Sequence, residues 1–192
     1  MATEPFDNAL ELPVAGVIDD SRPSRVEAEV MELFDELRAP LLRYQLSLGL
    51  PVQDAEEVVQ EVFLALHRHL REGKSRSNLR AWTFTVAHNL ALRSRMRSQR
   101  EDAAMPEDAA DPSPGPEERL AASQRQAPLQ AVVRALPEQD RLCLSLRAEG
   151  LRYREIARIL GISLGSVANS LERSLARLIR ADEYGSKYAT RD

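Results

Sequence analysis

Arginine, serine and asparagine side chains gather between residues 151 and 180, and this combination suits contact with nucleic acid. Six arginines stand there against two glutamates, a net charge of +4 in a chain whose formal net charge is −4. Guanidinium groups bind phosphate oxygens, and amide side chains read the edges of bases. The candidate DNA contacts in this segment are Arg154, Ser163, Ser166, Asn169, Ser170, Arg173 and Arg177.

The same segment carries the pattern of a helix-turn-helix, which would position these side chains. Ala157 is the small residue expected where the two helices cross, and Gly161 is expected to form the tight turn between them. Val167 is the apolar residue expected to pack the second helix against the first. Ser163 is expected to cap the second helix, with a staple between Ile162 and Val167. The residues expected to face inward are Val167, Leu171, Leu175 and Leu178, and those expected along one outward flank are Ser166, Ser170, Arg173 and Arg177. The alternative is a helical hairpin whose arginines only solvate its surface.

No group of residues indicates catalysis, a metal or a cofactor. The di-metal pattern of helical bundles places Glu three residues before His. The residues at that distance from the three histidines are Leu64, Leu66 and Thr85. No phosphate-binding glycine loop or nucleophile elbow occurs, and the single cysteine, Cys143, allows no internal disulfide. We therefore expect neither an enzyme nor a cofactor-binding protein.

Apolar residues recur at helical spacing in two parts of the chain, and a proline-rich acidic stretch divides them. Of 192 residues, 43% are hydrophobic and only 8 are glycine. This predicts an all-α protein with two small helical domains joined by a flexible acidic linker. The expected organisation is a disordered acidic tail over 1–24, a helical domain over 25–100, the linker over 101–119, a helix-turn-helix domain over 120–182 and a C-terminal tail over 183–192. We expect a cytoplasmic protein without membrane insertion, because no long apolar run or secretion signal occurs.

Four helices are expected in the first domain. The first starts near Val26 and breaks at Pro40, which opens a second helix ending near Leu48. Asp54 is expected to cap the third helix while Glu57 reaches back to it. Its buried stripe would consist of Ala55, Val58, Val59, Val62, Phe63, Leu66 and Leu70. The fourth helix would run over 79–97, after a polar loop over 73–78, with Leu79, Trp82, Val86 and Leu90 inward. In the second domain, a helix is expected over 138–148.

Three segments together resemble the small extracytoplasmic-function sigma factors. Residues 54–63 look like the family's polymerase-binding helix, residues 79–92 like its promoter-melting helix, and residues 136–178 like its upstream-element domain. The resemblance covers about 28–100 and 120–180, and it implies a protein that binds core RNA polymerase and directs promoter recognition. It also implies a regulatory partner such as an anti-sigma factor.

The resemblance implies roles for particular residues in the first domain. Those that would dock on a helix pair of the polymerase are Asp54, Glu57, Gln60 and Glu61, although charge alone also fits a solvated helix face. The loop from Ser75 and the helix after it would bind the opened strand of the −10 element through Ser77, Asn78, Arg80, Asn89, Arg93, Arg95 and Arg97. Trp82 and Phe84 have two interpretations, stacking on bases or packing in the core, and their helical spacing favours the core.

The helix from Leu164 would enter the major groove of the −35 element. It departs from the family pattern, which often has Lys and Arg after the valine, because Ala168, Asn169 and Ser170 stand there. We therefore expect weaker or differently specified duplex binding. The alternative function is a helix-turn-helix regulator with an N-terminal helical sensor domain. The acidic segments 1–20 and 101–118 are further expected to shield the arginines from DNA in the free protein.

Overall fold

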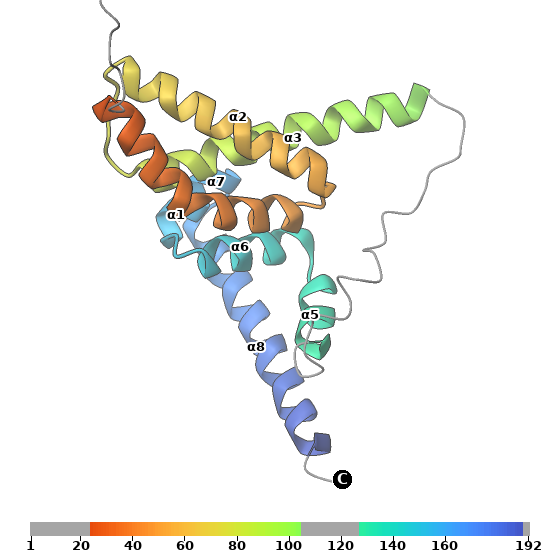
Figure 1. The fold of residues 1–192 in the computed structure, drawn as a ribbon. Coiled ribbons are helices and arrows are strands. Elements are labelled where there is room, and N and C mark those ends of the chain that lie inside the picture. Colours follow the sequence, from red (N-terminus) through yellow and green to blue (C-terminus); the bar gives the residue numbers. More distant parts are fainter. Residues whose placement is uncertain (1–23, 105–126, 190–192) are drawn as a thin grey trace, which may run out of the picture.

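The computed structural model describes residues 24–104 and 127–189, and these residues form helices joined by short turns (Figure 1). We call α1–α3 the N-terminal module and α5–α8 the C-terminal module. The helices are α1 (Arg25–Ser47), α2 (Val52–Arg71), α3 (Leu79–Ala104), α5 (Ala127–Arg134), α6 (Glu138–Ala148), α7 (Tyr153–Leu160) and α8 (Leu164–Ala189). The all-α prediction is confirmed. Residues 1–23 of the expected tail over 1–24, and residues 105–119 of the expected linker over 101–119, lie outside the described residues. The first four residues of that linker, 101–104, belong to α3.

Helix α2 forms the centre of the N-terminal module because one face of it is entirely apolar. All seven residues of the expected stripe are buried, with exposed fractions of 6% or less. Their three- and four-residue spacing places them on one face, which packs against α1 and α3. Phe63 also contacts the ring of Phe34 on α1, with ring centroids 4.8 Å apart. The predicted stripe is confirmed.

Helix α1 is continuous, so the expected break at Pro40 is wrong. Proline removes one backbone donor and usually interrupts a helix. Here the buried stripe of Leu37, Leu41 and Tyr44 runs past Pro40 on one face and holds both halves of the helix in line. At its start, the Ser24 hydroxyl accepts from the amide of Glu27, whose carboxylate accepts from the Ser24 amide. The cost of the missing donor is offset by the tertiary packing.

The start of α2 also differs from the prediction. Pro51 occupies the N-cap position, and no side chain caps this end. Asp54 lies inside the first turn instead, where its negative charge interacts favourably with the helix dipole. The expected capping pair of Asp54 and Glu57 is therefore wrong, although both acids remain at the helix start.

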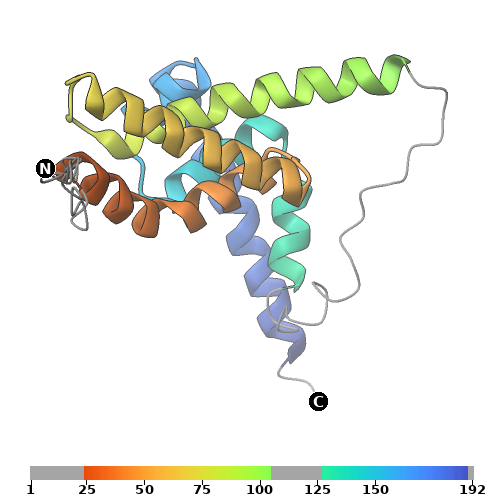
Figure 2. The same ribbon diagram turned by 45° about the horizontal axis from the view of Figure 1, so that its top comes forward.

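Helix α3 reaches Ala104, about two turns beyond the expected end at residue 97, and its C-terminal part projects past α2 (Figures 1 and 2). Its most deeply buried apolar residues are Ala81, Phe84, Ala87 and Ala91. Leu79 is buried as expected, whereas the other three predicted inward residues are only half-buried. Small alanines at the contact allow α3 to pack closely on its neighbours. The ring of Phe84 is fully buried, which favours its core role over stacking on bases.

The helix-turn-helix forms as predicted between α7 and α8. Gly161 ends α7 with φ +66°, a left-handed conformation that glycine adopts without strain. The Ser163 hydroxyl accepts from the amide of Ser166 at 3.0 Å and caps α8. Val167 and Leu171 are buried, but Leu175 is 50% exposed, so its expected inward position is wrong.

Three of the buried polar side chains of the N-terminal module, Tyr44, Gln45 and His88, lie in its core. The Tyr44 hydroxyl and His88 Nδ1 are 2.8 Å apart. Burial raises the pKa of Tyr44 and lowers the pKa of His88, so a neutral hydroxyl and a neutral imidazole share this hydrogen bond. The side-chain amide of Gln45 is fully buried, and neither its oxygen nor its nitrogen has a hydrogen-bond partner.

The two modules pack against each other and share one apolar core. Helix α1 contacts α6 and α3 contacts α7 (Figures 1 and 2). The connected set of buried apolar side chains runs from α1–α3 into α6–α8, and it includes Leu41 and Tyr44 from one module and Cys143 and Leu146 from the other. The sequence predicted two modules but not this contact. Within the described residues, no helix is both long and apolar enough to cross a membrane, and no group of side chains suits a metal ion.

Candidate nucleic-acid interface

A groove between α2 and α3 brings acids and arginines face to face. The α2 wall carries Asp54, Glu57 and Glu61, and the α3 wall carries Arg93 and Arg97. Glu57, Glu61 and both arginines are exposed, and Asp54 is half-buried. Three of the four acidic-helix candidates therefore share one surface, next to two of the basic candidates.

The fourth candidate of that helix, Gln60, lies on a different side of α2. It lines a shallow groove with Phe34, Arg38 and Glu56, between α1 and α2. The four residues that the sequence grouped together thus span two adjacent faces of one helix.

The basic candidates of α3 divide in the same way. Asn89 is exposed, and Arg93 and Arg97 line the groove with α2. Arg95 instead points toward the C-terminal module and donates to Glu138 at 2.7 Å. The hydrogen bond from Arg95 lowers the pKa of the Glu138 carboxyl. The arginines of this helix therefore form two surfaces and not one.

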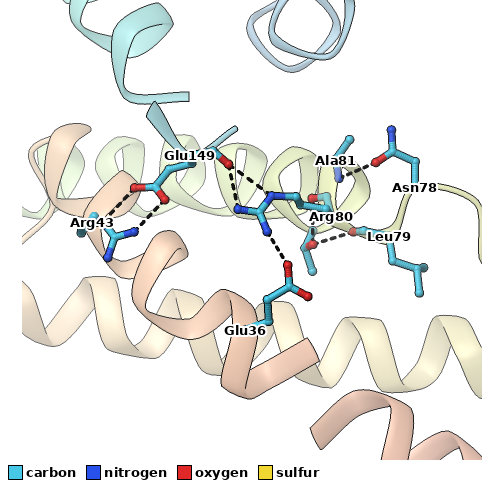
Figure 3. Close-up of polar contacts among 8 residues, drawn as sticks. Glu36, Arg43, Asn78, Leu79, Arg80, Ala81 and Glu149 are labelled. Carbon is cyan, nitrogen blue, oxygen red and sulfur yellow. Dashed lines mark hydrogen bonds and ion pairs between the residues drawn. The ribbon is translucent and has the colours of Figure 1, made fainter. Parts of the chain in front are cut away.

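The loop before α3 is held by its own side chains. Asn78 has φ +55°, and its side-chain oxygen accepts from the amide of Ala81 at 3.2 Å, which caps the helix start (Figure 3). The hydroxyls of Ser75 and Ser77 lie 2.8 Å apart. The Asn78 side-chain nitrogen donates to Glu155 of α7 at 2.6 Å. The loop is thus ordered and already in contact with the second module.

Arg80 lies at the centre of a polar cluster between the modules (Figure 3). Its guanidinium donates to the backbone oxygen of Glu149 at 2.8 and 3.2 Å and to the carboxylate of Glu36 at 2.6 Å. The Glu149 carboxylate accepts two hydrogen bonds from Arg43, at 2.7 and 2.8 Å. These bonds raise the pKa of Arg43. Glu149 therefore binds two arginines of the N-terminal module with different oxygens.

The expected contacts of α8 fall into free and occupied groups. Asn169 and Arg177 are exposed, as is Arg154 at the start of α7. Ser170 is fully buried and accepts from Gln139, so its expected outward position is wrong. Arg173 is half-exposed but donates two hydrogen bonds to Asp140, at 2.6 and 3.2 Å.

The pair of Asp140 and Arg173 joins the recognition helix to α6. The hydrogen bonds from Arg173 lower the pKa of Asp140, and the same contact raises the pKa of Arg173. The Asp140 side chain is only 1% exposed. Arg173 thus has a structural partner that the sequence analysis missed, because a helical wheel of α8 does not reveal which flank α6 covers.

Two arginines outside the predicted set also line a candidate surface. Arg152 and Arg158 surround a groove with Arg154, Tyr153 and Leu164, at the entrance to the helix-turn-helix. Their place in the basic segment after residue 150 was the signal that would have found them.

Comparison with known proteins assigns both modules. Residues 33–101 match the family model described as Sigma-70 region 2, and residues 126–178 match the one described as Sigma-70, region 4. The chain is 31% identical over 162 residues to the ECF RNA polymerase sigma factor SigL of Mycobacterium tuberculosis, covering 82% of this chain and 92% of SigL. The chain belongs to the extracytoplasmic-function sigma factors. It is a sigma factor of transcription initiation, with region 2 in α1–α3 and region 4 in α5–α8.

Other relatives of this sigma factor extend the comparison. It is 34% identical over 163 residues to the ECF RNA polymerase sigma factor SigE of Mycolicibacterium smegmatis, covering 77% of this chain but only 61% of SigE. It is 28% identical over 163 residues to RpoE of Cereibacter sphaeroides, covering 82% of this chain and 88% of RpoE.

Two solved structures share the fold. One is the sigma factor RpoE of Bartonella quintana in complex with the anti-sigma factor NepR, with a TM-score of 0.57, 23% identity, and coverage of 80% of this chain and 96% of that one. The other is CnrH in complex with the cytosolic domain of CnrY, with a TM-score of 0.53, 24% identity, and coverage of 80% and 86%.

Proposed function

We propose that this sigma factor binds core RNA polymerase through α2, holds the opened −10 strand with region 2 and reads the −35 duplex with α8. The observation that carries this proposal is the pair of separate exposed basic surfaces, one on α3 and one on the helix-turn-helix. A promoter-recognising protein needs both, because one element is read as a single strand and the other as a duplex. None of its residues acts as a catalyst, and it uses no cofactor.

The polymerase contact rests on Asp54, Glu57 and Glu61, which present a row of acids along one side of α2. An acidic surface suits a basic helix pair and steers association. Gln60 would reach the same partner only if that partner also covered the neighbouring face of α2.

The duplex contact rests on the exposed side chains of α7 and α8. Asn169 is positioned to read a base edge, and Arg177 and Arg154 to hold phosphates. Ser163 and Ser166 share the exposed start of α8, where the free amides of a helix N-terminus favour a phosphate. We leave Ser170 out of this set because it is buried.

The strand contact of region 2 rests on Ser77, Asn78 and Arg80 at the start of α3, and on Asn89, Arg93 and Arg97 farther along it. Trp82 is half-buried against the ring of His69, with centroids 4.4 Å apart, and keeps one part of its ring available. We place the protein's action in the cytoplasm, where polymerase and promoters meet. An anti-sigma factor is the regulatory partner we propose, since both structural neighbours were solved with such a partner or an analogous cytosolic domain.

The experiment is reconstitution of initiation. Sequencing the DNA bound by a tagged copy in its native cell supplies promoters, and run-off transcription with core polymerase then tests them. Glu61→Arg should abolish co-purification with core polymerase, whereas Asp35→Arg, an equal charge change at an exposed site of α1, should leave it intact. If the parent chain binds DNA but supports initiation from no tested promoter, the helix-turn-helix regulator with an N-terminal sensor domain is the better function.

A further inference from the structure

A short exposed loop joins α2 to α3, and it carries Ser77 and Asn78 of the proposed −10 contacts. Every residue from 73 to 78 is exposed, and Gly73 at its start has φ +68°. Exposed loops with few apolar contacts are usually mobile. A mobile loop has to be ordered each time it binds a strand, at a cost in conformational entropy. Any contact that fixes this loop beforehand therefore assists strand binding.

The imidazole of His69, in the last turn of α2, is hydrogen-bonded to this loop. Its Nε2 lies 2.8 Å from the backbone oxygen of Ser75. Because a carbonyl oxygen only accepts, Nε2 carries a proton and donates. The Ser75 hydroxyl in turn accepts from the amide of Ser77 at 3.2 Å and lies 2.8 Å from the Ser77 hydroxyl. His69 thus fixes the residue to which Ser77 is bound.

The same imidazole also contacts α3. The ring centroids of His69 and Trp82 are 4.4 Å apart, with 41° between the ring planes, and both residues are half-buried. Aromatic rings at this separation attract each other. A single side chain therefore connects the end of α2, the loop and the first turn of α3. His69 itself is not among the side chains proposed to contact DNA.

Other contacts of the loop are weaker or lie at its end. Arg76 donates to Glu29 of α1 at 3.1 Å, but this ion pair is accessible to solvent, and exposed ion pairs contribute little. At the end of the loop, the Asn78 side chain caps α3. The bond from His69 acts at the middle of the loop, and its donor belongs to a rigid ring that is already packed on Trp82. Little side-chain freedom is lost when this bond forms, so it restrains the loop more effectively than the ion pair.

We infer that His69 is a positioning residue for the −10 strand, because its Nε2 holds the 73–78 loop in place through the backbone oxygen of Ser75. The inference rests on the proposed function for the identity of the strand, whereas the order of the loop rests on the contacts alone. Ser77 and Asn78 are proposed to bind the opened strand and not the duplex. Loss of the His69 donor should therefore slow strand opening and leave binding of the closed duplex promoter unchanged.

Three variants of the full-length chain separate the donor from the ring. His69→Phe keeps a flat ring beside Trp82 but removes the donor. His69→Gln removes the ring but keeps an amide nitrogen that can donate to the same backbone oxygen. His67→Phe makes the same change as the first variant on the opposite side of α2 and is the matched control. Neither histidine belongs to the proposed DNA or polymerase contacts.

The order of the loop is measured without DNA, by amide hydrogen exchange over residues 74–78. One hydrogen bond to a neutral group contributes about 0.5–1.5 kcal/mol, which corresponds to about a two- to twelvefold change in an equilibrium constant. Exchange should therefore be about fivefold faster in His69→Phe than in the parent chain. It should stay close to the parent rate in His69→Gln and in His67→Phe.

Strand opening is measured with holoenzyme, on a promoter identified by sequencing the DNA bound by the tagged factor. Permanganate reactivity of unpaired thymines gives the opening rate, and filter binding at low temperature gives the affinity of the closed complex. We expect opening to be about fivefold slower in His69→Phe, with closed-complex affinity within about twofold of the parent. His69→Gln and His67→Phe should both open within about twofold of the parent rate.

Three results would overturn the inference. The first is loop exchange and opening rates that do not differ between His69→Phe and His67→Phe. The second is a His69→Gln variant as impaired as His69→Phe, which would mean that the ring matters and the donor does not. The third is closed-complex affinity that falls together with the opening rate, as general damage to region 2 would produce. A chain whose loop exchange changes as expected but which never initiates contradicts the proposed function and leaves the ordering of the loop by His69 standing.

Discussion

Removing either partner of the Asp140–Arg173 pair should destabilise region 4, but by unequal amounts. Asp140→Asn deletes a carboxylate that accepts two guanidinium hydrogen bonds, and it leaves Arg173, which is 52% exposed, able to turn toward water. Hydrogen bonds to charged groups contribute about 1.5–3 kcal/mol, and solvent access places this pair near the lower end, at about 2 kcal/mol. For a chain of this size, that corresponds to about 4–8 °C in melting temperature.

Arg173→Met should cost more than Asp140→Asn. It leaves the carboxylate of Asp140, which is only 1% exposed, without its counter-ion, and an uncompensated buried charge is more costly than an exposed one. The ordering of the two variants, measured by urea unfolding at pH 7 with the double variant completing the cycle, is the prediction. Equal costs, or a larger cost for Asp140→Asn, would refute the assignment of Asp140 as the buried partner.

The pH dependence gives a second reading of the same pair. Because Arg173 lowers the folded-state pKa of Asp140, the stability that this carboxyl contributes is present above its unfolded pKa and is lost as the pH falls through the folded value. The difference between the parent and Asp140→Asn should therefore be constant from pH 7 to about pH 5 and shrink below about pH 4. Loss of that difference already near pH 6 would contradict the reasoning.

Three further predictions concern single positions. Gln45→Leu should stabilise the chain by about 1–3 kcal/mol in urea unfolding, because it replaces a buried amide without hydrogen-bond partners by an apolar side chain of similar size. A destabilised variant would show that the amide has hydrogen-bond partners in the folded protein. Because burial lowers the pKa of His88, the free energy of unfolding should fall as the pH drops below about 6.5, where the unfolded state takes up the proton first. In His88→Phe this part of the pH dependence should disappear. An unchanged profile would contradict the assignment of His88 as the group that titrates. Gly161→Ala should lower the free energy of unfolding by about 1–2 kcal/mol, purely because of the left-handed backbone, since nothing lies within 4 Å of an added Cβ. Gly161→Asn should recover part of this loss, because asparagine tolerates that backbone conformation better.

The features that the sequence predicted are those decided by neighbouring residues. The buried stripe of α2 follows from spacing alone, and the turn at Gly161 with the cap at Ser163 follows from local backbone chemistry. The break expected at Pro40 is wrong because a missing backbone donor is visible in the sequence, whereas the tertiary packing that keeps the helix continuous is not. Ser170 was placed outward because spacing along α8 does not reveal where α6 lies.

The contact between the modules was beyond prediction for the same physical reason. Arg80 and the carbonyl of Glu149 are 69 positions apart, and nothing in the local pattern of either segment links them. The acidic segments expected to shield the arginines, 1–20 and 101–118, lie almost entirely outside the described residues. That expectation stays a prediction.

The apolar core shared by the two modules also bears on the survival of the protein in the cell. Separating the modules would transfer part of this shared core toward water, which costs free energy in proportion to the apolar area exposed. A molecule whose modules have come apart would offer proteases and chaperones a hydrophobic surface until the modules pack together again. The rate of that repacking would then contribute to the half-life of the factor.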